Sequence, residues 1–225
     1  MSSRHSGEYP VLVFGAGPVE MILSYALDRL SIPVALFDKS PAHQTTQYPK
    51  MDYTNARSME LFRLLRIAEE YRALQGAVNC DVKFESIFST SLGPMGKELG
   101  RWSVPSAREQ REKRKSLNDG TLPAEPGQRC SQIVFEEWMR GVILNRCKGV
   151  KFCGGWKYID HFEEDDLVKA RFQDLDGMVH SVPGRYLIGC DGGRSAVRKS
   201  AGIGMIGAQM YVMECFLDCW VGTDE

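Results

Sequence analysis

The apolar residues of this chain fall into short continuous runs and helically spaced stripes, in an order typical of an α/β protein. The run from Tyr9 to Phe14 predicts a first strand, and apolar residues recur at helical spacing from Met21 to Leu30. A β-branched run from Ile32 to Phe37 predicts a second strand that ends on Asp38. Strand, helix and strand in this order predict a βαβ unit.

The pattern is then interrupted by the polar stretch HQTTQYPKMDYTN, residues 43–55. A long helix is predicted over residues 58–74, with one apolar side formed by Met59, Phe62, Leu65 and Tyr71. Short strands are expected over 79–104, and a charged loop or exposed helix over 105–128. A further helix near 131–146 is expected to place five apolar side chains inward: Ile133, Val134, Trp138, Val142 and Ile143.

Strand-forming segments and turn signals alternate in the C-terminal half. WKYIDHF, LVKARFQD and MVHSV predict strands, separated by turns at EEDD and at Asp176-Gly177. They predict an antiparallel meander that leads into a strand over YLIGC, residues 186–190, and then into a helix opened by DGGRSAVRKSAGI. The expected fold class is therefore α/β, with a Rossmann-like βαβ core and an antiparallel β-meander.

A glycine turn joins the first predicted strand to the first helix in the sequence GAGPVE. Gly15 lets the chain leave the strand sharply, and Gly17 lets backbone amides approach a pyrophosphate. Asp38 lies 23 residues after Gly15, near the spacing at which an acid accepts hydrogen bonds from an adenosine ribose. The turn therefore predicts a dinucleotide site.

Glu20 stands where this turn usually has a third glycine for close packing of helix on strand. Two hypotheses follow for its role. Glu20 either caps the helix, where the helix dipole tolerates an acid, or it blocks the pyrophosphate site by its bulk and charge. We expect the second, so that Glu20→Gly tightens cofactor binding.

A second glycine turn follows the predicted strand YLIGC in the sequence CDGGRSAVR. An acid, Asp191, precedes two glycines that allow close approach of a ligand, and Ser195 and Arg198 lie at the start of the next helix. Either turn alone is a weak signal. Two such turns at the ends of strands in one sheet could face a single extended dinucleotide.

Composition narrows the kind of ligand. The chain is 43% hydrophobic and 25% charged with a formal net charge of -1, so it has no general attraction to nucleic acid or acidic membranes, and we expect a small molecule. Its seven cysteines lack CxxC spacing, which predicts buried thiols in a reducing, cytoplasmic compartment and no metal site; no membrane span is expected. The basic stretch REQREKRK, residues 108–115, is diluted by two glutamates, and we interpret it as a solvated face.

Five segments together resemble the class A flavoprotein monooxygenases, particularly the phenol and chlorophenol hydroxylases built on the p-hydroxybenzoate hydroxylase fold. They are GAGPVE, LFDK, MDYTNARSMELFR, RCSQIVFEEWMR and GCDGGRSAVR. The resemblance spans nearly the whole chain. It implies FAD as cofactor, NAD(P)H as co-substrate, and hydroxylation of a small phenolic or aromatic substrate with O2.

The resemblance also implies the residues of the site. The cofactor-binding residues that it implies are Gly15, Gly17, Pro18, Asp38, Lys39, Arg57, Arg129, Gln132, Asp191, Gly192, Ser195 and Arg198. Asp52 matches the position of an acid that helps to deprotonate the phenol, which implies a catalytic role as general base. From the residues alone we favour other roles: Asp52 as a loop acid or helix cap, Arg57 as a solvated helix charge, and Gln132 as part of a helix cap.

The resemblance divides the chain into a FAD-binding domain over 1–205, with a partial substrate-domain insertion near 78–128, and the start of a substrate-domain sheet over 206–225. No GDAAH-type segment, which in the family makes a second FAD contact, is present. We therefore expect a truncated enzyme with slow or no turnover of phenols, from a relic gene or a fragmentary gene model. A homodimer or a complementing C-terminal chain stays open.

Two other functions stay open. The truncation favours a non-catalytic FAD-binding or partner-binding remnant. An NAD-dependent Rossmann enzyme is disfavoured by the meander before GCDGG and by the lack of a catalytic Tyr-x-x-x-Lys.

Overall fold

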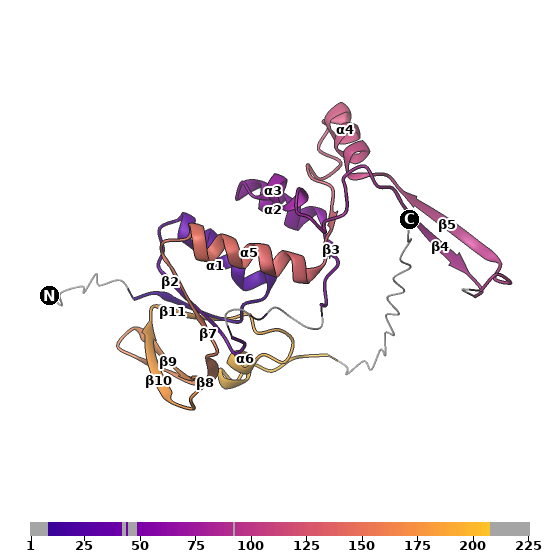
Figure 1. Ribbon diagram of the computed structural model, residues 1–225. Coiled ribbons are helices and arrows are strands. Elements are labelled where there is room, and N and C mark those ends of the chain that lie inside the picture. The colour runs from indigo at the N-terminus through magenta and orange to yellow at the C-terminus, as the bar shows by residue number, and fades with distance from the viewer. Residues whose placement is uncertain (1–8, 42–43, 45–48, 92, 208–225) are drawn as a thin grey trace.

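The computed structural model describes residues 9–41, 44, 49–91 and 93–207 (Figure 1). Most of the strand expected over 206–225, together with Cys215 and Cys219, lies outside the described residues. The α/β fold class is confirmed, because a parallel sheet forms the centre of the molecule and helices cover it.

The central sheet has four parallel strands in the order β11-β1-β2-β7. Its members are β1 (Val11–Phe14), β2 (Val34–Asp38), β7 (Val150–Gly154) and β11 (Tyr186–Gly189). All four residues of β1 and the first four of β2 are buried, because both faces of the sheet are covered. This burial explains why these strands have continuous apolar runs instead of alternating ones.

The two faces of the sheet carry different layers. Val11 and Val13 face a core shared with α1 (Pro18–Arg29) and α5 (Gln132–Arg146). Leu12 and Phe14 point the other way, into a core shared with the meander. Figure 1 shows the helix pair on one side of the sheet and the meander on the other, so the body has three layers.

The predicted meander is confirmed. Its strands are β8 (Lys157–Glu164), β9 (Leu167–Gln173) and β10 (Val179–Gly184), paired antiparallel in the order β10-β9-β8. Phe172 is fully buried and stacks on Phe37 of the parallel sheet with ring centroids 4.0 Å apart. Beyond β11, α6 (Ala196–Ser200) begins where the second glycine turn ends.

The single helix expected over 58–74 is wrong. Two helices replace it, α2 (Ala56–Leu64) and α3 (Ala68–Arg72). The chain leaves α2 through Arg66, whose φ is +62°, and the N–H of Ile67 donates to the carbonyl of Phe62 at 2.9 Å. This is a Schellman ending, which usually has glycine at the left-handed position. An arginine there leaves no glycine to signal the break.

Two further expectations need correction. The strand β7 was not expected, although it pairs with β2 at the edge of the sheet. Ile133, expected to point inward, is 36% exposed, whereas Phe135 and Met139 of the same helix are buried. The apolar side of α5 is therefore rotated toward the sheet and α3.

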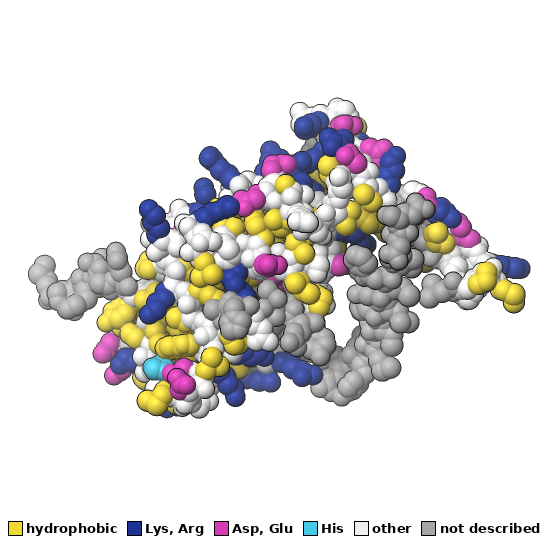
Figure 2. Space-filling view, in the orientation of Figure 1, with side chains coloured by type: hydrophobic (Ala, Val, Ile, Leu, Met, Phe, Trp, Pro, Cys, Tyr) yellow, Lys and Arg dark blue, Asp and Glu magenta, His cyan; other side chains and the backbone are white. Residues whose placement is uncertain are grey.

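An excursion from this body contains the remaining elements. They are β3 (Tyr53–Thr54), β6 (Gln128–Arg129), the hairpin β4 (Phe84–Ser89) and β5 (Glu98–Val104), and α4 (Ala107–Leu117). Helix α4 has no buried residue, and Figure 2 shows acidic and basic side chains interspersed over it. The basic stretch 108–115 thus lies on an exposed helix. No helix of the described part is long and apolar enough to cross a membrane.

Candidate functional site

The two glycine turns lie at the same edge of the parallel sheet. β1 ends at Gly15, β2 ends at Asp38 and β11 ends just before Cys190, and all three strands run in the same direction. The carboxyl ends of parallel strands are where open α/β sheets bind their ligands. The structure therefore brings the predicted turns and Asp38 together.

The first turn is held to the second strand by Asp38. Its Oδ2 accepts a hydrogen bond from the N–H of Ala16 at 2.8 Å, and its Oδ1 accepts one from the N–H of Ser40 at 2.6 Å. Gly15 has φ +107°, a conformation in which a side chain would be strained. Gly17 is the N-cap of α1 and Pro18 follows in its first turn. The carboxylate thus shapes the turn before any ligand binds.

The side chain of Glu20 lies inside this turn. Glu20 is only 4% exposed, and its Oε1 lies 2.5 Å from where a Cβ on Gly15 would stand. Its Oε2 is 3.1 Å from the corresponding position on Gly17. Burial raises the pKa of Glu20 to about 7, against the lowering effect of hydrogen bonds from the N–H groups of Glu20 and Gly17; Asp38 and Asp191 raise it further.

The second turn is organised by Asp191. Its carboxylate accepts hydrogen bonds from the hydroxyl of Ser195 and the N–H of Ala196, both at 2.5 Å, while Ser195 is the N-cap of α6. A Cβ on Gly192 or Gly193 would meet nothing within 4 Å. The acid therefore fixes the loop, and its two glycines leave open space beside the helix start.

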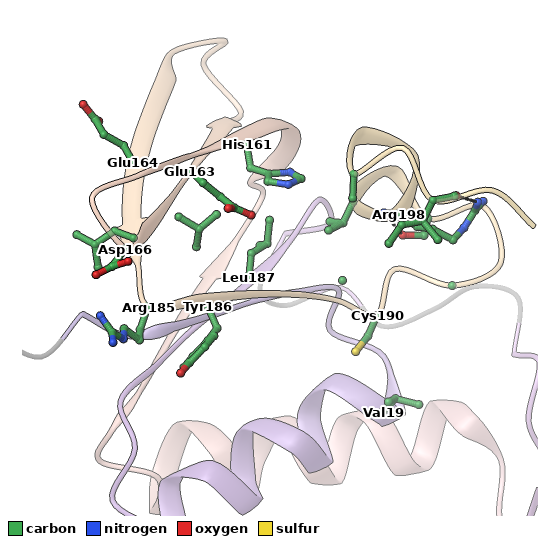
Figure 3. A pocket seen from close by; sticks show the side chains of 18 of the residues that line it. Val19, His161, Glu163, Glu164, Asp166, Arg185, Tyr186, Leu187, Cys190 and Arg198 are labelled. Carbon is green, nitrogen blue, oxygen red and sulfur yellow. Dashed lines mark hydrogen bonds between the residues drawn. The ribbon is translucent and has the colours of Figure 1, made fainter.

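An open groove of about 1150 Å³ runs along β11 from this second turn. Figure 3 shows Val19, Cys190 and Arg198 at one end, and Glu163, Asp166 and Arg185 toward the other. Gly15, Gly17 and Asp38 do not line it. This groove therefore reaches the start of α1 at Val19 and the second turn at Gly192 and Gly193, but it does not include the first turn.

Asp52 and Arg129 form a second cluster on the small sheet of β3 and β6. Their side chains make an ion pair, and the Arg129 guanidinium lies 4.9 Å from the ring centre of Phe84. A pocket of about 410 Å³ lies beside this ion pair, and its lining includes Arg129 and the rings of Tyr53, Phe84 and Trp102. The Asp52 side chain is 75% exposed, so it is a loop acid within reach of solvent.

Gln132 and Arg57 differ in how firmly they are held. The Gln132 Oε1 accepts a hydrogen bond from the N–H of Lys50 at 2.7 Å, and its Nε2 donates to Glu136 at 2.6 Å. It therefore ties α5 to the segment before Asp52, and Ser131, not Gln132, caps the helix. Arg57 is 78% exposed and pairs only loosely with Glu60 at 3.6 Å. Lys39 is exposed at the end of β2.

Sequence reasoning did not identify the backbone N–H groups that hold the side chains of the site in place. The N–H groups of Ala16, Ser40 and Lys50 each donate to a predicted site residue. Every residue except proline has a main-chain N–H, so the residue type does not show which of these groups donates to the site. No group of three His, Cys, Asp or Glu side chains in the described part could hold a metal ion, and among the described cysteines Cys130 and Cys147 are buried.

Comparison with known proteins agrees with this geometry. The sequence profile of a family described as the FAD binding domain matches residues 8–221. The chain is 35% identical over 202 residues to the FAD-dependent monooxygenase apdD of Emericella nidulans, covering 89% of this chain and 31% of that protein. It is 30% identical to the 2,4-dichlorophenol 6-monooxygenase of Cupriavidus pinatubonensis, covering 84% of this chain and 30% of the relative.

Solved structures give the same result. The flavin-dependent monooxygenase PieE, in complex with FAD and substrate, superposes with a TM-score of 0.73 at 26% identity, covering 89% of this chain and 33% of PieE. A ternary complex of aklavinone-11 hydroxylase with FAD and aklavinone superposes with a TM-score of 0.72 at 25% identity, covering 89% of this chain and 36% of the hydroxylase. The chain spans about a third of the length of the relatives it matches.

Proposed function

We propose that this chain, which belongs to the FAD binding domain family, binds FAD at the carboxyl edge of its parallel sheet and serves the hydroxylation of a phenolic or other aromatic compound with NAD(P)H and O2. The observation that carries the proposal is the meeting of Gly15, Asp38 and Asp191 at that edge. The named relatives include an enzyme named for a chlorophenol, the 2,4-dichlorophenol 6-monooxygenase. Bound FAD would supply the redox chemistry, which no side chain of the site provides.

The residues around the first turn fit the adenosine and pyrophosphate half of FAD. The N-terminus of α1 presents backbone N–H groups and the positive end of its dipole to the phosphates. Asp38 stands at the end of β2, where it can accept from ribose hydroxyls while holding the turn. Gly192 and Gly193 leave room for a chain of atoms to pass the second turn. The misfit is Glu20, which occupies the turn.

The substrate side of the proposal rests on the aromatic pocket beside Asp52. Tyr53, Phe84 and Trp102 offer flat apolar faces for a ring, and Arg129 offers a cation to a phenolate. Asp52, now paired with Arg129, would take the phenol proton as general base. The hairpin β4–β5 also exposes Phe88 and Trp102, which supports assigning residues 78–128 to a substrate domain.

A second candidate function is FAD binding without catalysis. The carboxyl of Glu20 in the first glycine turn favours this second function. A turn that is already occupied binds the cofactor less tightly, and catalysis requires bound cofactor.

The absorption spectrum of the purified chain tests the first step. We expect bands of oxidised flavin after incubation with FAD and desalting, and their loss on addition of NADPH or NADH under anaerobic conditions. Hydroxylated product from a chlorophenol in air would support the monooxygenase function, whereas bound flavin without product would support the non-catalytic one. A spectrum with no flavin at any FAD concentration would contradict both.

Replacing Asp38 with Ala should weaken FAD binding at least about tenfold, because a charged hydrogen bond contributes on the order of 1.5 to 3 kcal/mol. Loss of the anchor on Ala16 adds to the effect. Titration of FAD with flavin fluorescence as the signal measures it. Asp28→Asn, at the far end of α1, is the control, and unchanged affinity in Asp38→Ala would place the ribose elsewhere.

Replacing Asp52 with Asn should weaken binding of a chlorophenol about tenfold and leave FAD affinity within about twofold. The amide oxygen can accept a hydrogen bond from the phenol, but it cannot take up the phenol proton. The perturbation of the bound flavin spectrum by the phenol reports the affinity. Asp176→Asn, in the exposed turn of the meander, is the matched control. Equal phenol affinity in both variants would exclude Asp52 from the substrate site.

A further inference from the structure

The carboxyl of Glu20 takes the place of an anion in the first glycine turn. Glu20 is the third residue of α1 after the N-cap Gly17, the position from which a glutamate reaches back to the N-cap N–H. Helix N-terminal N–H groups of this kind are the ones that bind phosphate. Because the side chain is buried within the turn and stands against both glycines, a pyrophosphate and the Glu20 carboxylate cannot occupy the turn at once.

The surroundings of Glu20 disfavour a second negative charge. Asp38 at the end of β2 and Asp191 after β11 both face it and raise its pKa, although burial is the largest cause. Cys190, the third titratable neighbour, has its own pKa raised by burial, Glu20 and Asp191, so it stays a neutral thiol. An incoming dianionic pyrophosphate adds to this repulsion.

We propose that the Glu20 carboxyl is an internal ligand of the glycine turn that the cofactor's pyrophosphate must displace, and that the displaced carboxyl is held neutral beside it, so that cofactor binding takes up a proton. The inference rests on the proposed function, since it concerns the same turn. The Glu20 side chain is itself only 4% exposed, and the acids at the other two strand ends disfavour its ionised form, so the displaced carboxyl stays neutral. The residue is thus a built-in competitor for the cofactor.

The direction of the pH dependence follows. The free chain holds Glu20 half protonated near pH 7, so below this pH the carboxyl is already neutral and displacing it costs no proton. Above pH 7 each binding event must first protonate it, and affinity falls as pH rises. Between pH 6 and pH 8 the dissociation constant for FAD should rise about tenfold, and proton uptake at pH 8 should approach about one per FAD.

Titration of FAD at pH 6, 7 and 8 tests this, with calorimetry in two buffers of different ionisation enthalpy to count protons. Glu20→Gln cannot ionise, so it should bind FAD with an affinity that does not change over this range and should take up no proton. Asp28→Asn, an acid variant at the other end of the same helix, should keep the wild-type slope. Equal slopes in wild type and Glu20→Gln, or proton release on binding, would overturn the inference and leave FAD binding intact.

A second readout needs no flavin. The ¹³C signal of the Glu20 carboxyl, assigned by its loss in Glu20→Gln, should titrate near pH 7 in the free chain and at higher pH in saturating inorganic pyrophosphate. A carboxyl whose titration pyrophosphate does not shift would overturn the inference. If no variant binds FAD at any pH, the proposed function fails, and the response of this signal to pyrophosphate still decides whether Glu20 competes for the turn.

Discussion

Glu20→Gly is expected to tighten FAD binding about 100-fold at pH 8, equivalent to about 2.7 kcal/mol. Removing the charge beside the pyrophosphate accounts for about a factor of ten at this pH. Removing the side chain also clears the turn for the phosphate, since the Glu20 carboxyl now stands against Gly15 and Gly17, and each hydrogen bond that the turn then donates to the charged phosphate contributes about 1.5 kcal/mol or more. Flavin fluorescence in a titration at low salt measures the change.

The helix α1 is expected to lose a little stability in Glu20→Gly, because glycine in a helix is about 1 kcal/mol less favourable than alanine. Val19→Gly is the matched control, since Val19 lies in the same turn but is 67% exposed. We expect Val19→Gly to lose similar stability without gaining affinity. Equal or weaker FAD binding in Glu20→Gly than in wild type would show that the turn accommodates the glutamate.

Arg72→Met is expected to destabilise the chain by about 3 to 5 kcal/mol, because it removes one partner of a buried ion pair. The side chains of Arg72 and Glu125 are 5% and 7% exposed and 3.1 Å apart. Arg72 also donates to the carbonyl of Pro126 at 2.6 Å and to the Gln128 side chain at 2.8 Å. Urea unfolding followed by circular dichroism measures the loss.

Arg57→Met on the neighbouring helix is the control for this effect. The Arg57 side chain is 78% exposed and its partner Glu60 is 3.6 Å away, so the change should stay within about 0.5 kcal/mol. Because Gln128 precedes Arg129 in β6, Arg72→Met should also loosen the cluster of Arg129 and Asp52. Similar unfolding curves for the two variants would show that the ion pairs of Glu125 with Arg111 and Arg63 are enough to hold it.

Much of the fold could be predicted because its signals are local. The buried runs of β1 and β2, the glycine turn after Phe14 and the turns of the meander are specified by residues next to one another. β7 could not be predicted, since it is only five residues long with Lys151 among its apolar side chains, and only pairing with β2 makes it a strand. The break after α2 was hidden because an arginine occupies its left-handed position.

The candidate site divides in the same way. The spacing from Gly15 predicted Asp38 at the end of a strand, and the second glycine turn predicted Asp191 just after one; the structure places both at the carboxyl edge of the sheet. The partners that hold them are mostly main-chain N–H groups, which residue type does not reveal. The bond from Arg72 to Glu125 joins positions 53 residues apart, so no local pattern indicates it.

By itself the sequence determined the βαβ unit, the meander, the two glycine turns and the presence of an acid at position 20, because each depends on neighbouring residues. Only the tertiary structure decided where the Glu20 carboxyl goes. Its burial within the turn depends on the strand ends that carry Asp38 and Asp191, which are distant in sequence and meet only when β2 and β11 pair with β1. The charge of Glu20 and its position in the glycine turn are local properties of the sequence. Its burial and its repulsion by Asp38 and Asp191 arise only from the packing of the strands.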